Sequence, residues 1–342
     1  MDGRVFIFWN WSVAVYLFIA GVSAGAFLVS ALAYFLGVEK YERIIRIGAY
    51  ITPFPLLLGL LCLIYDLERP HLFWKLLVKF QPSSVMSLGS WLLVLFSLLS
   101  FLHFYLWLPV RFELLKTILY LYSRFPKVKL FQILQSAPFV TRLSRENLIR
   151  IRGWVAFWGI LLSAAVGIYT GILLGAVVAR PFWNSPVLPL LFLLSAIKTG
   201  TASILLAGFF LKGFQGMKRE EIEGSRLLLQ SIDLILMVFS IIAVFLFIFG
   251  MYASTKSSAE AVKLIMGGEF TLIFWGLVVG MGLVFPLIVG VQELAPHFVK
   301  TRELREHSPW MTGVVTASVL LGAFMLRYVV VYAGQMAQVI WS

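Results

Sequence analysis

The sequence predicts an all-α integral membrane protein with eight transmembrane helices. Hydrophobic residues make up 61% of the 342 residues and charged residues only 13%, which leaves too little polar surface for a soluble globule. A helix needs roughly 20 apolar residues to cross a hydrocarbon core of about 30 Å. Eight stretches reach that length, and they lie near 12–37, 45–66, 86–110, 153–179, 187–211, 227–252, 270–292 and 311–335.

The distribution of Lys and Arg predicts the orientation, because short cytoplasmic loops carry an excess of positive charge. If both termini lie outside, nineteen of the 28 Lys and Arg residues fall in cytoplasmic loops and seven outside. The remaining two, Lys198 and Arg327, fall within spans. The net charge of +12 therefore reflects topology and contact with anionic lipid, and it does not indicate nucleic-acid binding. No basic segment precedes the first apolar run, so we expect that run to remain as a span.

Internal similarity predicts two halves. The segment SAGAFLVSALAYFLG of the first span aligns with KTGTASILLAGFFLK of the fifth, and IYTGILL of the fourth with VYAGQMA of the eighth. Their small residues allow helix backbones to approach closely. Parallel repeats of this kind predict two four-helix bundles, residues 1–180 and 181–342. The first half also carries an insertion, about 111–152, whose apolar and basic residues predict amphipathic helices on the cytoplasmic interface or, alternatively, a partner site.

Few residues of the protein could ligate a metal. Cys62 is the one cysteine and lies in an apolar span, so the protein can form neither an iron–sulfur cluster nor an internal disulfide by itself. Of the four histidines only His103 lies in a span, and the loops hold His71, His297 and His307. We therefore expect no haem, metal or iron–sulfur cluster in this polypeptide. A redox role would require an organic carrier that dissolves in the bilayer, with the metals on another subunit.

Polar residues inside the spans form two groups, and each needs a partner or a wet cavity in hydrocarbon. The first group lies in the outer half of the first four spans and consists of Tyr16, Asp66, Glu68 and Tyr169. The second lies in the last four spans and consists of Lys198, Asp233, Glu293 and Arg327. Each group also has a purely structural interpretation. The first group could consist of aromatic residues at the membrane interface and charged residues at a solvated helix end. The second group could form ion pairs between helices.

Four segments, in matching order, resemble a known family. They are FWNWSVAVYLFIAGVSAGAFL, IYDLERPHLFW followed by FQPSSVMSLGSW, IYTGILLGAVVARPFWNSP, and AFMLRYVVVYAGQ. Together they resemble the NrfD-like family, the quinone-binding membrane subunit of polysulfide reductase and its relatives. The resemblance implies a multi-pass anchor in the inner (cytoplasmic) membrane that exchanges electrons between menaquinol, or another quinone, and an extracytoplasmic ferredoxin-like subunit with four 4Fe–4S clusters.

The resemblance also implies a molybdenum or tungsten bis-pterin catalytic subunit on the periplasmic or outer side. This polypeptide would then hold no catalytic centre for the terminal substrate. The partner determines both the terminal substrate and the direction of electron flow. Movement of protons across the membrane would accompany electron transfer only if uptake and release occur on opposite sides.

The family pattern implies a quinone site near the outer face of the first bundle. Tyr169 matches a fourth-span tyrosine that contacts the quinone, whereas Val13 and Tyr16 stand where the family has an asparagine and a histidine. Tyr16 can donate a hydrogen bond to a carbonyl but cannot replace histidine as a proton acceptor at neutral pH. The role of proton acceptor therefore shifts to Asp66 and Glu68.

The candidate site residues fall into three sets. The candidates for quinone binding are Tyr169, Tyr16, Asn10 and Trp11. The candidates for proton transfer are Asp66, Glu68, Lys198, Asp233, Glu293 and Arg327. The outer loop DLERPHLFWKLLVKFQPSSVMSLGSW is expected to cover the quinone slot, and the surface that docks the iron–sulfur subunit is expected to include Arg69, His71, Trp74, Trp91 and Arg180.

Two other classes of function are compatible with the sequence. A secondary transporter or proton channel without a redox partner would use the charges of the second half, with helices broken near the membrane centre. Pro53, Pro55 and Pro286 fit that pattern. A purely structural anchor would leave the quinone site elsewhere in the complex.

Overall fold

The computed structural model describes residues 9–67, 69–78, 80–108, 145–210, 219–298 and 309–337, and every element of secondary structure in them is helical. In sequence order the elements are α1 (Trp11–Ile51), α2 (Pro53–Tyr65), η1 (Pro70–Leu72), α3 (Trp74–Val78), α4 (Val85–Trp107), α8 (Arg145–Gly175), α9 (Leu188–Phe210), α10 (Arg219–Ala253), α11 (Lys256–Val262), η2 (Ile273–Val284), α12 (Phe285–Phe298) and α13 (Pro309–Met336).

Within the described residues, seven helical segments are long and apolar enough to cross a membrane. This confirms the prediction of an all-helical polytopic membrane protein. Most of the predicted insertion (about 111–152), up to residue 144, lies outside the described residues. Its end, 145–152, belongs to α8. The seventh predicted span is built from two elements, because the π-helical turns of η2 give way to α12 next to Pro286, which lacks a backbone donor.

The first of the seven segments, Trp11–Tyr65, is 55 residues long and folds back on itself. The helix breaks at Gly37, whose φ of 141° lies in the region that favours glycine. Beyond the break the backbone returns along its own first part: the Ser30 hydroxyl donates to the Ile45 carbonyl at 2.9 Å, and the Ser23 hydroxyl donates to the Thr52 carbonyl at 2.6 Å. This segment is therefore an antiparallel helical hairpin.

The two repeat-related helices α1 and α9 pack directly on each other. A Cβ atom added to Gly25 would lie 1.8 Å from the Ala196 carbonyl oxygen, and one added to Gly200 would lie 2.0 Å from the Gly25 carbonyl carbon. Only glycine permits this approach of two helix backbones. Gly25 and Gly200 lie in the two aligned segments, so the small residues of both segments meet at the contact between α1 and α9.

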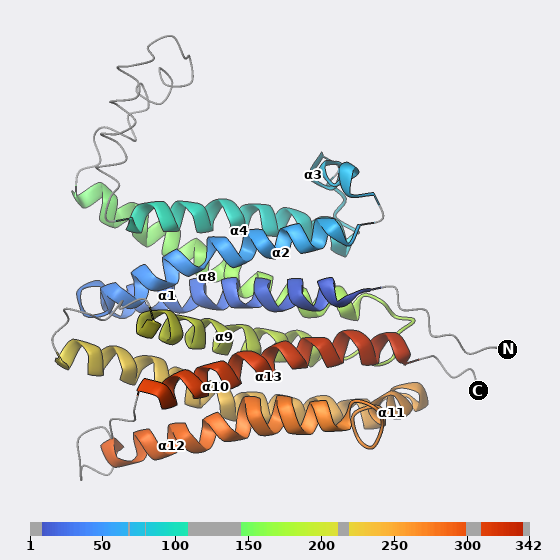
Figure 1. Ribbon diagram of the computed structural model, residues 1–342. Coiled ribbons are helices and arrows are strands. Elements are labelled where there is room, and N and C mark those ends of the chain that lie inside the picture. The colour runs from blue at the N-terminus through green and yellow to red at the C-terminus, as the bar shows by residue number, and fades with distance from the viewer. Residues whose placement is uncertain are drawn as a thin grey trace.

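Figure 1 shows α2 and α4 on one side of the first part of α1 and α9, α13, α10 and α12 on the other, while α8 crosses behind α1 and packs against α1, α4 and α9. The ends of the first and last helices are joined. The Trp9 backbone N–H donates to the Gln335 side chain at 2.8 Å, and the Gln335 amide donates to the Trp9 carbonyl at 3.0 Å. The Trp9 ring stacks on that of Trp183 with 4.9 Å between centroids. We call this side of the molecule the terminal end, and the side that holds the Gly37 turn the opposite end.

Candidate functional site

A cavity of about 170 Å³ lies at the terminal end between α1, α2, α4 and α8. Its wall is mostly apolar and is formed by Leu60, Leu63, Ile64, Leu67, Phe73, Leu77, Met86, Leu93, Val94 and Leu173. The polar groups in the lining belong to Tyr16, Ser90 and Tyr169. Three lining residues, Phe73, Leu77 and Met86, are exposed, so the cavity opens onto the apolar surface beside α4. Such a site suits an apolar ring system that carries few polar atoms.

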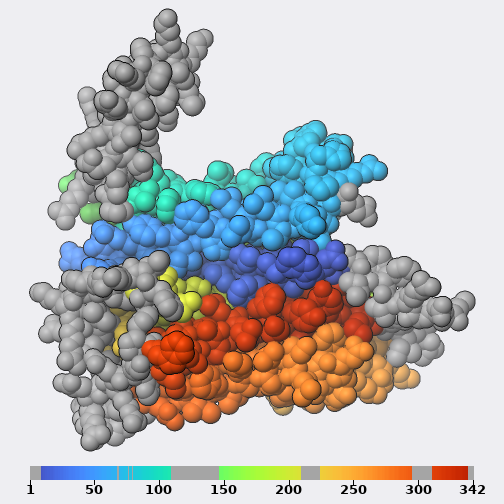
Figure 2. Space-filling model, in the orientation of Figure 1, coloured from blue at the N-terminus to red at the C-terminus, as the bar shows by residue number. Residues whose placement is uncertain are grey.

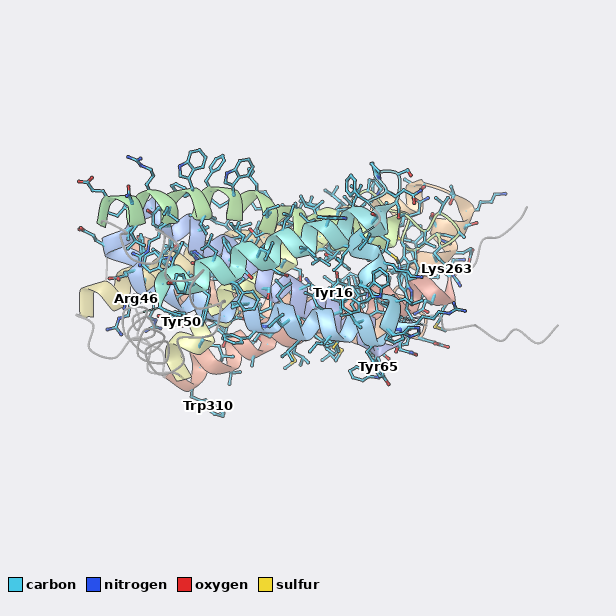
Figure 3. The ribbon with its side chains drawn as sticks, turned by 90° about the horizontal axis from the view of Figure 1, so that it is seen from above. Tyr16, Arg46, Tyr50, Tyr65, Lys263 and Trp310 are labelled. Carbon is cyan, nitrogen blue, oxygen red and sulfur yellow. The ribbon has the colours of Figure 1, made fainter. Side chains whose placement is uncertain are left out.

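Tyr16 projects from α1 into the interior, where Figure 3 shows it surrounded by helices. Its side chain is 1% exposed, and its hydroxyl has no hydrogen-bond partner among the described residues. The ring packs next to Gly59 of α2, where a Cβ would lie 3.5 Å from the ring, an ordinary contact distance. A buried hydroxyl without a partner costs about 1–3 kcal/mol, so this donor calls for an explanation.

Tyr169 reaches the same cavity from α8 and is close enough to Tyr16 for the two phenols to interact electrostatically. Its ring occupies a notch in α4, where a Cβ added to Gly89 would lie 1.7 Å from the phenol Cζ. The neighbouring Ser90 hydroxyl donates to the Met86 carbonyl at 2.9 Å. The cavity therefore presents two phenol groups from two helices within an apolar wall.

Asp66 ends α2 at the terminal end and accepts a hydrogen bond from the Ser12 hydroxyl at 2.7 Å. This bond joins the start of α1 to the end of α2, and the next residue, Leu67, lines the cavity. Asp66 is therefore next in sequence to a residue of the cavity wall, and its own side chain is not among the lining residues. Glu68, the other predicted proton acceptor, lies outside the described residues.

The loop between α2 and α4 contributes to the cavity wall through Phe73 and Leu77, one before and one within α3. In Figure 2 the segment that carries α3 projects from the helical body. The predicted docking residues Arg69, His71 and Trp74 are exposed on this segment. Trp91 differs, because it is half-buried in α4 and its ring packs edge-on against Phe80 with 6.0 Å between centroids.

Three other predicted site residues do not line the cavity. Asn10 is exposed at the start of α1, and Trp11 is 63% exposed on the outside of the helix. Arg180 donates to the Gln335 carbonyl at 2.5 Å, so its guanidinium ties the turn after α8 to the end of α13. Of the four residues predicted to bind a quinone, Tyr16 and Tyr169 line this cavity and Asn10 and Trp11 do not.

Arg327 is fully buried and connects three helices. Its Nε donates to the Leu17 carbonyl of α1 at 3.0 Å, and a terminal nitrogen donates to the Ser195 hydroxyl of α9 at 2.8 Å. The guanidinium fits because α1 has Gly21 at this level, where a Cβ would lie 2.6 Å from the second terminal nitrogen. Arg327 thus attaches α13 to the backbone of Leu17, the residue that follows Tyr16 in α1.

The other charged residues of the second half lie among α9, α10 and α12. Lys198 is buried in α9 and interacts electrostatically with Asp233 of α10 and with Arg327. Asp233 and Glu293 both line a smaller cavity of about 40 Å³, where the Gln230 amide donates to the Glu293 carboxylate. Asp233 therefore shares a cavity with Glu293 and acts electrostatically on Lys198, and none of the predicted proton-transfer residues of the second half lines the cavity of Tyr16 and Tyr169.

Sequence reasoning did not single out Gly89, Ser12 or the apolar wall residues of α4. Gly89 lies in the quoted segment SLGSW, and a glycine within a span is a signal for close approach by another group. The partner of Gly89 could not be read from the sequence, because Tyr169 lies on a helix that is distant in the sequence.

The comparisons with known proteins cover nearly the whole sequence. Residues 3–339 match the family model described as polysulphide reductase, NrfD. The protein is 35% identical to the C component of the polysulfide reductase of Wolinella succinogenes, over 96% of this sequence and 95% of that protein. It is 31% identical to protein NrfD of Escherichia coli, over 96% and 95% of the two sequences. It is 28% identical to the C component of the selenate reductase of Mesobacillus selenatarsenatis, over 96% and 74%.

Proposed function

Because the protein belongs to the polysulphide reductase NrfD family, we propose that it is the membrane anchor subunit of a molybdenum or tungsten reductase complex and exchanges electrons with a membrane quinone. Similar proteins carry the names of components of polysulfide reductase and selenate reductase. A polysulfide or sulfur substrate is the first choice for the complex, since the polysulfide reductase relative is 35% identical over nearly the full length. The partners are an iron–sulfur subunit and the bis-pterin catalytic subunit.

The observation that carries the quinone proposal is the Tyr16 hydroxyl, which has no hydrogen-bond partner among the described residues and whose residue lines an apolar cavity together with Tyr169. A quinone head group is an apolar ring with carbonyl oxygens that accept hydrogen bonds, so it fits both the wall and the donors. Menaquinone, or another quinone, would supply two-electron and two-proton redox chemistry there. The opening beside α4 would admit such a molecule directly from the bilayer.

Each residue of the cavity has a role that follows from its chemistry. Tyr16 and Tyr169 donate hydrogen bonds to carbonyl oxygens and thereby orient the bound head group. Asp66, which precedes the lining residue Leu67, accepts or returns a proton, and Glu68 stands close to it in sequence as a second acceptor. The leucine and phenylalanine wall excludes bulk water. Electrons pass to or from the iron–sulfur subunit, which docks on the segment that carries Arg69, His71 and Trp74.

We propose that this segment faces the periplasm or cell exterior. The hairpin Trp11–Tyr65 supplies two crossings, which with the six other long helical segments gives eight crossings, so both termini lie on the same side. We infer that this side is the outside. Cytoplasmic loops then carry most of the Lys and Arg residues, in agreement with the positive-inside rule. Residues 1–180 and 181–342 form two four-helix bundles that meet along α1 and α9.

The charged cluster of the second bundle is a candidate route for protons. Glu293 and Asp233 share the smaller cavity, Asp233 interacts with Lys198, and Lys198 interacts with Arg327. Glu293, Asp233 and Lys198 can each accept or donate a proton, and their electrostatic influence extends to Arg327, which contacts α1. Arg327 acts as a fixed positive charge and as the attachment to the backbone beside Tyr16, because a guanidinium keeps its proton.

Binding of a quinone analogue to the purified protein tests the proposed site. We expect Tyr169→Phe and Tyr16→Phe to weaken binding about five- to tenfold each, since each removes one hydrogen-bond donor. Tyr65→Phe is the matched control, because Tyr65 is 79% exposed and lies outside the cavity. Unchanged binding in both cavity variants would refute the site. Purification from the native membrane separates the alternatives, since a transporter would come without an iron–sulfur protein.

A further inference from the structure

Ser90 of α4 faces the apolar cavity, and the function proposed above gives it no role. The cavity lining on this helix consists of Met86, Ser90, Leu93 and Val94. Residues at this spacing form one stripe along a helix, and Ser90 lies near the middle of the stripe. Ser90 is half-buried and is the polar member of the four. A ligand in the cavity therefore meets a hydroxyl group on the α4 wall.

The hydroxyl proton of Ser90 is already engaged. The hydroxyl donates to the Met86 carbonyl of the preceding turn at 2.9 Å. The Met86 side chain is exposed where the cavity opens onto the apolar surface, and in a bilayer no water competes there for the proton. A serine hydroxyl has one proton and two lone pairs, so Ser90 presents lone pairs to the cavity.

The residue before Ser90 brings a phenol to the same wall. A Cβ added to Gly89 would lie 1.8 Å from the Tyr169 hydroxyl oxygen, so that oxygen lies against the α4 backbone next to Ser90 in sequence. Both Tyr169 and Ser90 line the cavity. One bound head group can therefore contact both hydroxyl groups.

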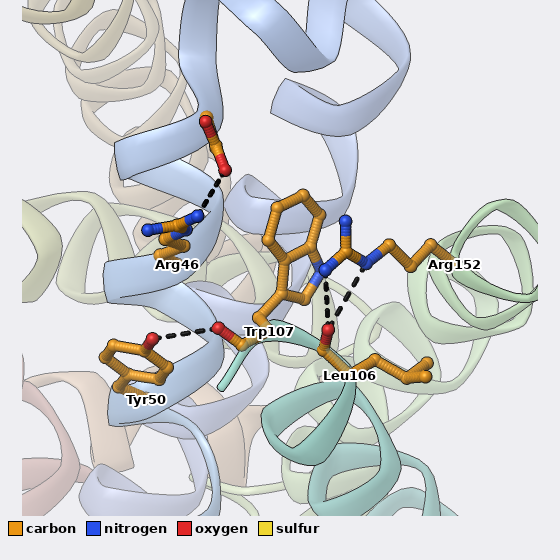
Figure 4. Close-up of polar contacts among 6 residues, drawn as sticks. Arg46, Tyr50, Leu106, Trp107 and Arg152 are labelled. Carbon is orange, nitrogen blue, oxygen red and sulfur yellow. Dashed lines mark hydrogen bonds and ion pairs between the residues drawn. The ribbon is translucent and has the colours of Figure 1, made fainter. Parts of the chain in front are cut away.

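The far end of α4 is held by side chains of two neighbouring helices. Arg152 of α8 donates to the Leu106 carbonyl at 2.7 Å, and Tyr50 of α1 donates to the Trp107 carbonyl at 2.8 Å, as Figure 4 shows. The Arg152 guanidinium also lies 3.9 Å from the centre of the Trp107 ring. Contacts near both ends thus fix the rotation of α4 about its own axis, and Ser90 stays in the cavity wall.

The two redox forms of a quinone need different partners in such a wall. The oxidised form has carbonyl oxygens that only accept hydrogen bonds, whereas the reduced form, the quinol, has O–H groups that donate. Tyr16 and Tyr169 can serve both forms, because a phenol hydroxyl donates and accepts. Ser90 adds a hydrogen bond only with the quinol. To donate to a carbonyl it must first give up its bond to Met86, so the number of hydrogen bonds stays the same.

We propose that Ser90 is a specificity-determining residue that makes the cavity prefer the reduced form of the quinone. This inference rests on the proposed quinone function and adds which redox form the site selects. Ser90 accepts a hydrogen bond from a quinol O–H group, orients that group and does not keep its proton.

The loss of this hydrogen bond on oxidation favours release of the product. Oxidation of the quinol breaks two O–H bonds, sends two electrons to the iron–sulfur subunit and gives two protons to acceptors such as Asp66. A carbonyl oxygen then faces the Ser90 lone pairs, and two acceptors repel each other. The product is therefore held less tightly than the substrate, as suits a complex in which electrons leave the quinol for a terminal substrate.

The test is an anaerobic titration of the purified full-length protein with dimethylnaphthoquinone and, separately, with its quinol. Ser90→Ala removes the lone pairs and introduces a good helix former. We expect the affinity for the quinol to fall about five- to tenfold, as for loss of one hydrogen bond, and that for the quinone to stay within about twofold. A tenfold change in their ratio lowers the midpoint potential of the bound two-electron couple by about 30 mV.

Ser97→Ala is the matched control on the same helix. The Ser97 hydroxyl makes the same type of bond, to the Leu93 carbonyl at 2.7 Å, and Ser97 is not among the lining residues of the cavity. Both affinities should therefore match those of the unsubstituted protein. Ser90→Thr should keep the preference for the quinol, because a threonine hydroxyl can donate to the same carbonyl of the preceding turn.

Two results would overturn the inference. Equal loss of both affinities in Ser90→Ala would show that Ser90 only shapes the cavity, and an unchanged affinity for the quinol would show that its hydroxyl does not contact the ligand. If Ser90→Ala does not fold, Ser90→Cys replaces it, since a thiol is of similar size and is a weak acceptor. The quinone function is judged separately, because it is refuted if the unsubstituted protein binds neither form.

Discussion

The ring of Tyr169 occupies the space in which any side chain at residue 89 would have to lie, because a Cβ on Gly89 would come within 1.7 Å of the phenol Cζ. Gly89 therefore determines how far Tyr169 enters the cavity from α8. This contact makes a backbone position of α4 part of the site, although Gly89 has no side chain of its own.

We predict that Gly89→Ala displaces Tyr169 and weakens quinone-analogue binding at least as much as Tyr169→Phe does, about five- to tenfold. The added methyl group does not fit beside the phenol, so the ring must leave its notch. Titration with the analogue measures the loss. Gly250→Ala is the control, because no atom lies within 4 Å of the Cβ position at Gly250. Full affinity in Gly89→Ala would mean that the position of Tyr169 is irrelevant to binding.

Tyr16→Phe should separate binding from stability. The substitution removes a buried hydroxyl that has no described partner, so the ligand-free protein is expected to gain about 1 kcal/mol of unfolding free energy or to remain unchanged. Analogue affinity should fall in the same variant, since the donor serves the ligand. Thermal unfolding in detergent, with and without analogue, measures both effects. A clear loss of stability without ligand would indicate that the hydroxyl has a partner within the protein.

Arg327 and Gly21 form a second pair in which a glycine makes room for a large group. A Cβ on Gly21 would lie 2.6 Å from a guanidinium nitrogen, so Gly21→Ala is expected to lower stability by about 1–3 kcal/mol through overpacking. Thermal unfolding of the detergent-solubilised protein reports the change. Gly313→Ala in α13 is the matched control, because no atom lies within 4 Å of its Cβ position. Equal melting temperatures for Gly21→Ala and the unsubstituted protein would show that the Arg327 guanidinium moves freely to make room for the added methyl group.

Much of the fold followed from the sequence because membrane helices are long, apolar and rich in small residues at their contacts. The site followed only in part. Tyr16 and Tyr169 lie together as expected, whereas Trp11 faces away, because five residues rotate a helix by about 140° from the face of Tyr16. Proximity along the sequence could not reveal that difference. The attachment of Arg327 to Leu17 depends on two helices that are distant in sequence, so no local pattern could predict it.

The orientation of the protein is open to a test with single cysteines, and it decides on which side the cavity lies. In a Cys62→Ala background, Lys263→Cys is expected to react with a membrane-impermeant maleimide added to intact cells, because Lys263 is exposed just after α11 at the terminal end. Lys40→Cys should react only after the cells are opened, because Lys40 is exposed beside the Gly37 turn. The positive-inside rule requires this result, since Lys40, Arg43 and Arg46 lie together at that turn. The reverse pattern would place the cavity and the projecting α3 segment in the cytoplasm, and electron exchange with an outer iron–sulfur subunit would then be impossible.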